Sequence, residues 1–335
     1  MTFDMARSII EPYLKKSEGT VYISFLGGET LLAIDIIRPI IEWIEHGHWN
    51  RPYIIHGTTN GTLLNDDLKI WLREHKHSLT LALSYDGIPL SQRNNRGRDN
   101  IDIDFFINTW PQQPIQMTIT SETVDQMADG VIYLLEKGAI VHPNVAYETN
   151  EWPDNKLLEY GRQLNKLINY YNTHKKYPII NQFTHDLCEY ANCIDHPKPN
   201  NEICGACNGL KVFDTDGKYY PCHILSPLVL EGEKLEAVKN GIVTETTDYL
   251  DDTCLTCPYS SSCPTCIACN YNYRGSFQKR DKTHCKIIQI EVKATIKKEV
   301  LRLKAKEKLS PEDALIVDSI IKLVDYEKNS QLFHN

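Results

Sequence analysis

Short apolar runs alternate with longer amphipathic segments over the first half of the chain. Runs with the length and the β-branched or aromatic content of strands lie at residues 21–25, 53–55, 79–84, 115–119 and 141–147. Segments with helical periodicity separate them, and such alternation is typical of parallel α/β units. The sequence therefore predicts an α/β fold with five parallel strands.

The amphipathic segments predict the intervening helices. Asn65 is placed to cap one of them, Gly138 to end another, and Pro39 to kink or restart a third. The chain opens on a helix with no strand ahead of it, so we expect the first strand of the series to be missing. The predicted helices cover residues 5–14, 33–44, 66–75, 124–135 and 153–171.

The composition changes at about residue 185. Residues 185–284 are rich in Cys, Pro, Asn and Gly and show few periodic runs. A segment with so little core of its own is expected to rely on metal for stability. Helical character returns over residues 286–326, in two segments divided at Ser310 and Pro311.

Charge and targeting features exclude several classes of protein. The formal net charge of −8 gives no electrostatic reason to expect a nucleic-acid partner. No apolar run approaches the ~20 residues of a membrane span, and the N-terminus lacks the layout of a signal peptide. We therefore expect a cytoplasmic protein without a membrane partner.

All eleven cysteines lie between Cys188 and Cys285. A reduced compartment disfavours structural disulfides, and an odd count prevents complete pairing. The cysteines are thus interpreted as metal-binding or catalytic.

The cysteines form two groups. In the first, a hairpin turn over residues 214–217 is expected to return Cys222 beside Cys204 and Cys207. The second group is a closely spaced run followed by one distant residue: Cys254, Cys257, Cys263, Cys266, Cys269 and Cys285. Thiolates at such spacings converge on a metal centre without long loops to order.

Structural zinc is the main alternative for these groups, because paired CxxC motifs are common zinc ligands. The pairs Cys204/Cys207 and Cys254/Cys257 are, however, much farther apart than the ~15–20 residues of a zinc ribbon. The second group also holds more cysteines than one tetrahedral ion needs. Iron–sulfur clusters therefore account better for the pattern.

The layout resembles the SPASM domain of radical S-adenosylmethionine (radical SAM) maturases, which holds two auxiliary 4Fe–4S clusters. The resemblance assigns the first cluster to Cys204, Cys207, Cys222 and Cys266, and the second to Cys254, Cys257, Cys263 and Cys285. The family spacing would place the last cysteine of the run at Ile267. Cys266 and Cys269 flank that position, and Cys266 is favoured. Cys188 and Cys193 have no place in the pattern and are expected to be spare buried thiols.

Three motifs at the ends of predicted strands extend the resemblance. Gly27-Gly28-Glu29 follows the first strand and resembles the family's GGE motif, which holds the amino group of S-adenosylmethionine, although Thr30 replaces the common proline. The segments "TTNG" (58–61) and "SYDG" (84–87) follow the next two strands. Chemistry in α/β barrels lies at this edge of the sheet. The resemblance implies cofactor contacts by Gly27, Gly28, Glu29, Asn60, Ser84, Asp86 and Arg96.

The resemblance implies a partial (β/α)6 radical SAM barrel without its first strand over residues 1–183. A SPASM domain would follow over 184–290, with C-terminal helices over 291–335. The family's catalytic CxxxCxxC occurs nowhere in the chain, so we expect S-adenosylmethionine binding to be compromised and the chain to be inactive as it stands.

The family uses a 5′-deoxyadenosyl radical to abstract hydrogen from a ribosomal peptide or protein. The implied partners are that substrate, an electron donor and a separate leader-peptide-binding protein. Two alternatives stay open: a cluster-binding scaffold subunit without radical chemistry, and a zinc-stabilised structural protein. His56, His223 and Glu148 lie near the predicted sites. His223 follows Cys222 directly and is a candidate donor to a cluster, and Glu148 is a candidate to face the substrate.

Overall fold

The structure is a computed structural model that describes residues 1–16, 18–146, 148, 151–200, 204–206, 209–242, 249–263 and 265–329. The chain divides into two compact units. The first unit comprises Met1–Val145 with Phe213–Tyr220, and the second comprises Ala146–Val212 with Pro221–Asn335. The domain boundaries expected from the sequence stay a prediction.

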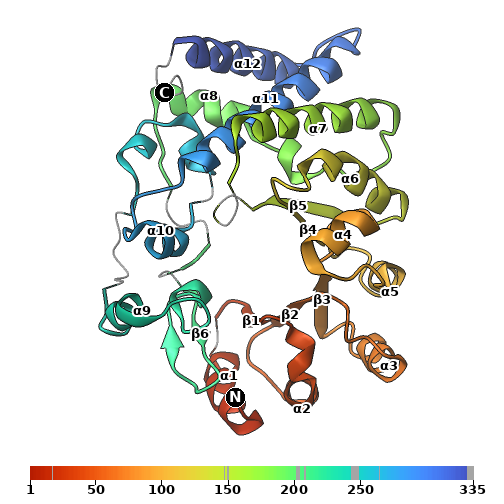
Figure 1. Cartoon of the computed structure of the whole chain (residues 1–335), viewed down its shortest axis with the longest axis vertical. Helices are drawn as coiled ribbons and strands as arrows, with labels where there is room; N and C mark the ends of the chain where they lie inside the picture. The colour runs from red at the N-terminus through yellow and green to blue at the C-terminus, as the bar shows by residue number, and fades with distance from the viewer. Residues whose placement is uncertain are drawn as a thin grey trace. The chain divides into compact units, whose positions relative to one another are not determined.

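All five predicted strands are present in the first unit and run parallel (Figure 1). Strands β1 (Val21–Phe25), β2 (Tyr53–Thr59) and β3 (Leu79–Leu83) form one sheet in that order, and β4 (Ile115–Ile119) pairs with β5 (Val141–Val145). A single bridge between Ser84 and Gln116 connects β3 with β4. The order along the chain is therefore the order in space, as in a series of β/α units.

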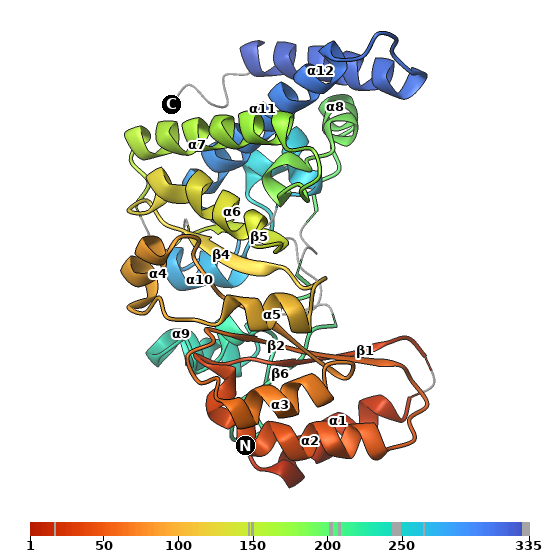
Figure 2. The same cartoon turned by 90° about the vertical axis from the view of Figure 1, so that its right-hand side faces the viewer.

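The two strands β1 and β2 bury only one of their faces. Ile23 and Ile55, opposite each other in the register, are buried, whereas Tyr22 and Ile54 are 69% and 45% exposed. Strict alternation of this kind means that one face packs on helices and the other is open. In Figure 2 the helices α1 to α3 lie below these strands, on one side of the sheet.

Helices between the strands supply the packed face. Ile40, Ile41 and Ile44 of α2 are almost fully buried, and the helix is continuous through Pro39. Asn65 caps α3 as predicted, because its Oδ1 accepts a hydrogen bond from Leu68 N at 2.8 Å. The helical elements of this unit are α1 (Phe3–Leu14), η1 (Thr30–Ala33), α2 (Ile34–His46), α3 (Asp66–Glu74), α4 (Pro89–Arg96), α5 (Ile103–Thr109), η2 (Val124–Gln126) and α6 (Met127–Glu136).

The predicted hairpin is confirmed by β6 (Val212–Phe213) and β7 (Tyr219–Tyr220). Asp214 N donates to Lys218 O at 2.9 Å, and Gly217 N donates to Asp214 O at 2.9 Å. Gly217 has φ +80°, a conformation that glycine adopts without steric cost. The hairpin leads directly into Cys222.

The second unit is mainly helical. Helix α11 packs along α7, and α12 packs along α8 (Figure 1). The predicted division at Ser310 is confirmed, since Ser310 caps α12 and its N–H donates to the Asp313 carboxylate at 3.0 Å. The elements are α7 (Asp154–Thr173), η3 (Asn181–Phe183), α8 (Leu187–Asp195), η4 (His223–Leu225), α9 (Gly232–Lys239), η5 (Asp252–Cys254), η6 (Pro258–Ser261), α10 (Ile267–Arg274), α11 (Lys282–Lys304) and α12 (Pro311–Asn329).

A chain of buried hydrogen bonds crosses this helical unit. Tyr160 Oη of α7 donates to Glu291 of α11 at 2.5 Å, and the second oxygen of Glu291 lies 3.1 Å from His185 Nε2. His185 Nδ1 lies 3.0 Å from Tyr190 Oη, which in turn lies 2.7 Å from Ser262 Oγ. Burial raises the pKa of Tyr190 to about 12. The chain thus links three helices to the residue that precedes Cys263.

Across the described ranges, no helix is both long enough and apolar enough to pass through a bilayer.

Candidate functional site

The Glu29 carboxylate joins the ends of β1 and β2. Its Oε1 accepts hydrogen bonds from Leu31 N at 3.0 Å and from the Thr59 hydroxyl at 2.6 Å, and its Oε2 accepts from Asn60 N at 2.8 Å. Two predicted cofactor residues, Glu29 and Asn60, are therefore brought together. A carboxylate held by neutral donors keeps its negative charge for a cationic ligand group.

Gly27 and Gly28 precede this carboxylate and border open space. A Cβ atom added at either position would meet no protein atom within 4 Å. Neither residue has a positive φ, so the turn itself does not require glycine. Among the described residues, the backbone at these two positions is thus accessible to a ligand, and binding of S-adenosylmethionine here stays a prediction.

Asp86 and Arg96 pair with each other. Asp86 is 1% exposed, and Arg96 donates to its two oxygens at 2.8 and 3.0 Å. Thr118 N, on β4, donates to Asp86 Oδ1 at 2.8 Å. The Asp86 carboxylate is thus engaged by the protein and fixes Arg96, while Ser84 pairs through its backbone with Thr59 O at 2.8 Å.

The open face of β1 and β2 carries a polar pair. Ser24 Oγ lies 2.6 Å from His56 Nε2. Partial burial lowers the pKa of His56, so its imidazole is neutral near pH 7. This side chain is exposed on the open face, next to the strand ends that carry Glu29 and Asn60.

Two thiols of the second group contact a buried guanidinium. Arg280 Nη1 donates to Cys254 Sγ at 2.8 Å, and Nη2 donates to Cys263 Sγ at 3.0 Å. The positive charge of Arg280 also acts on the thiols of Cys257 and Cys285. The predicted set Cys254, Cys257, Cys263 and Cys285 thus lies close enough for these charges to interact, and its role as a ligand set stays a prediction.

Burial raises the pKa of Cys257, Cys263 and Cys285. It raises the pKa of Cys263 to about 12 and that of Cys257 to about 11, although Arg280 opposes the shift. Thiols with such values are protonated near pH 7, so a metal centre must displace their protons when it binds. Sequence reasoning missed Arg280, because it considered only ligating residue types. Several buried thiolates need a nearby cation, and this need could have indicated a residue such as Arg280.

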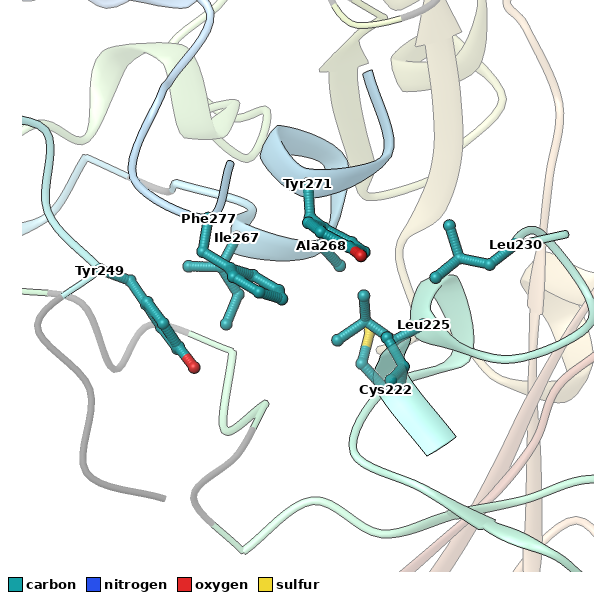
Figure 3. Close-up of a cluster of buried hydrophobic side chains, with 9 residues drawn as sticks. Cys222, Leu225, Leu230, Tyr249, Ile267, Ala268, Tyr271 and Phe277 are labelled. Atoms are coloured by element: carbon teal, nitrogen blue, oxygen red, sulfur yellow. The ribbon is translucent and has the colours of Figure 1, made fainter. Parts of the chain in front are cut away.

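The first thiol group lies around Cys222. This residue belongs to the apolar cluster of Figure 3, with Leu225, Ile267 and Tyr271 as neighbours. The charges of Cys266 and Cys204 act on Cys222. Cys204 and Cys266 thus each lie within electrostatic range of Cys222, and the ligand set of this group stays a prediction. The fourth predicted ligand, Cys207, lies outside the described residues.

Cys266 and Cys269 lie together at the start of α10. Cys266 Sγ caps this helix by accepting from Cys269 N at 3.4 Å. A hydrogen bond from the Cys269 thiol lowers the pKa of Cys266 to about 7 and raises the pKa of Cys269. Cys266 is therefore the thiol of the pair that loses its proton more readily. Which of the two ligates a cluster stays a prediction.

Glu148 forms a bidentate ion pair beside these cysteines. Its oxygens accept from Arg274 at 2.8 and 2.9 Å, and the Glu148 charge acts on both Cys266 and Cys269. His223 Nδ1 lies 4.0 Å from Cys222 Sγ, and burial lowers the pKa of His223.

The two cysteines outside the pattern lie in α8. Cys193 is buried and donates to Glu189 at 3.6 Å, and Cys188 is half-buried. Within the described residues, no group of three or more Cys, His, Asp or Glu is arranged to hold a single metal ion.

Comparisons with known proteins give likeness in structure alone. No family model matches the sequence, and no curated protein matches it. Among solved structures, native anSMEcpe with bound AdoMet shares 17% identity with a TM-score of 0.64, over 90% of this chain and 88% of that one. anSMEcpe with AdoMet and the Kp18Cys peptide shares 18% identity with a TM-score of 0.63, over 90% and 89%. SuiB of Streptococcus suis bound to S-adenosylmethionine shares 18% identity with a TM-score of 0.56, over 85% and 70%.

Proposed function

We propose that this chain belongs to a radical SAM/SPASM maturase that acts on a ribosomal peptide or protein. Its fold is that of the solved structures of anSMEcpe and SuiB with bound AdoMet, which agrees with the resemblance found in the sequence. The observation that supports the proposal most is the proximity of the second-group thiols to one another and to Arg280 in such a fold.

S-adenosylmethionine would lie at the open space beside Gly27 and Gly28. Glu29 would accept a hydrogen bond from its ammonium group, because its carboxylate is held in place by Thr59 and Asn60. Asp86 would orient Arg96, which together with Ser84 would contact the carboxylate or ribose. When bound with a reduced catalytic cluster, this cofactor supplies a carbon radical that removes a hydrogen atom from the substrate.

The two thiol groups would hold two auxiliary 4Fe–4S clusters. Cys204, Cys207, Cys222 and Cys266 would ligate the first, and Cys254, Cys257, Cys263 and Cys285 the second. The protein would supply cysteine thiols that lose their protons when the cluster binds, a dry surrounding and hydrogen-bond donors to sulfur.

A peptide substrate is supported by the comparison, since two of the similar structures were solved with peptides bound. The open face of β1 and β2, with Ser24 and His56, would face such a substrate. An electron donor and a separate leader-peptide-binding protein complete the proposed set of partners.

The absence of CxxxCxxC from the sequence favours a second candidate. Without three thiolates for a catalytic cluster, this polypeptide alone should not cleave S-adenosylmethionine, and it would act as a cluster-binding scaffold or partner subunit.

Metal analysis of anaerobically purified protein tests the proposal. Two 4Fe–4S clusters correspond to about eight iron and eight acid-labile sulfide per chain. Protein without labile sulfide would refute it, and protein with zinc in place of iron would establish the structural alternative. Release of 5′-deoxyadenosine under reducing conditions then separates a complete enzyme from a scaffold.

A further inference from the structure

Arg280 is a buried cation that contacts two sulfur atoms. The residue is 6% exposed, and two of its nitrogens donate to Cys254 and Cys263 at 2.8 and 3.0 Å. A buried charge needs a partner of opposite sign to offset the loss of hydration. Thiol sulfur atoms are weak acceptors, so they offset the burial of the Arg280 charge only when they carry negative charge themselves.

A third donor of the same side chain has no acceptor. Arg280 Nε is buried and lacks a hydrogen-bond partner among the residues that the structure describes. An unsatisfied buried donor is unfavourable, and such groups indicate a ligand or a functional constraint. The location of this donor on a side chain that contacts Cys254 and Cys263 points to an anionic ligand with acceptor atoms.

We infer that Arg280 is a positioning residue of the second thiol site, which stays beside the metal centre and donates N–H groups to its sulfur atoms. This inference rests on the proposed function, because the ligand is the second auxiliary 4Fe–4S cluster. The four cysteines do not need this cation in order to act as ligands; Arg280 instead acts on the charge of the centre that they would hold.

The physical consequence is a raised reduction potential. One-electron reduction adds a negative charge to a cluster that is already anionic. A guanidinium keeps its positive charge at any accessible pH, and burial keeps water from screening it. Arg280 therefore stabilises the reduced form more than the oxidised form.

Redox titration of the second cluster in the full-length chain tests the inference. The Cys222→Ala background disrupts the first site, so the remaining electron paramagnetic resonance signal belongs to the second. In this background Arg280→Met should lower the potential enough to change the oxidised-to-reduced ratio at least tenfold, about 59 mV for a one-electron couple. Arg280→Lys keeps the charge and should give a smaller change.

The matched control is Lys282→Met, which removes a cation from the same segment. The Lys282 side chain is 59% exposed, so water screens it and its removal should change the ratio less than twofold. An unchanged potential in Arg280→Met, with the cluster retained, would refute the inference while leaving the proposed function intact.

Loss of the cluster gives equally clear results. Retention in Arg280→Lys with loss in Arg280→Met would support a requirement for the charge. Loss in both variants would overturn the inference, because side-chain shape rather than charge would then decide. Wild-type protein without iron and labile sulfide would instead refute the proposed function itself.

Discussion

Replacement of Arg96 by methionine should destabilise the first unit, because it leaves the Asp86 carboxylate buried without its cation. Breaking a buried ion pair from one side costs about 3–5 kcal/mol. Arg96 is 28% exposed, so some water reaches the gap, and Thr118 N still donates to the carboxylate. We therefore expect the low end of that range, about 3 kcal/mol.

Asp86→Asn should cost less, about 2 kcal/mol, because the neutral amide still accepts from Thr118 and the freed guanidinium reaches solvent. The double variant Asp86→Asn/Arg96→Met should also cost about 2 kcal/mol, well below the sum of the single changes. The difference is the coupling energy of the pair.

Fluorescence-monitored unfolding in urea or by heat is the suitable assay. Four of the five tryptophans lie in the first unit, so the signal reports mainly on it: Trp43, Trp49, Trp71 and Trp110. A loss of about 3 kcal/mol lowers Tm by roughly 6–12 °C for a unit of this size.

Arg93→Met is the control, since Arg93 lies on the same helix but pairs with Asp99 at the surface, where an ion pair contributes at most about 1 kcal/mol. Additive effects of Asp86→Asn and Arg96→Met would refute the pairing argument. Unchanged stability in Arg96→Met with lost S-adenosylmethionine binding would show that Arg96 serves the cofactor alone.

Three further changes test other parts of the molecule. Gly28→Val should leave Tm unchanged, because its Cβ meets no protein atom, yet weaken S-adenosylmethionine binding at least tenfold by calorimetry; unchanged affinity would place the cofactor elsewhere. Gly87→Ala should cost about 3 kcal/mol in urea unfolding, because φ is +90° and the Cβ would lie 2.6 Å from Gly130 Cα; a loss under ~1 kcal/mol would contradict this packing. Ser310→Ala should destabilise α12 by about 1 kcal/mol through loss of its cap, seen as faster hydrogen exchange in that helix. The hydrogen bond from Lys306 keeps the pKa of Asp313 well below its usual 3.8. The stabilisation by Asp313 is therefore complete above pH ~4 and is lost as the pH falls through its lowered pKa. Protection of α12 from hydrogen exchange that stays constant down to pH 2, in a protein that is still folded, would contradict this.

The regular part of the fold follows from local patterns. All five strands lie where apolar runs predicted them, and the helices with apolar stripes are present. Helix α4 was missed because its sequence, PLSQRNNR, has no apolar stripe; its buried side chains are Ser91 and Gln92. Helices α8 and α10 were missed although their buried residues follow helical spacing, because these short patterns lie within a cysteine-rich stretch of low overall periodicity.

Motif position indicated Glu29 and Asn60, which the structure brings together. The resemblance to the SPASM domain, rather than spacing alone, selected four thiols of the second group, and their role as ligands stays a prediction. The pairing of Asp86 with Arg96 follows no local rule, because it depends on the turn between β3 and α4. The contact of Glu148 with Arg274 joins residues far apart in sequence, so only the tertiary structure reveals it.

The buried series of hydrogen bonds from Tyr160 to Ser262 has a consequence for the order of folding and iron binding in the proposed maturase. It connects the residue before Cys263 to three helices through hydrogen bonds between protein side chains. In the proposed maturase, one wall of the second thiol site would thus be built during folding, before iron binds. Iron loading would then be a late step on a folded polypeptide, and helices α7, α8 and α11 should survive when a chelator removes the iron.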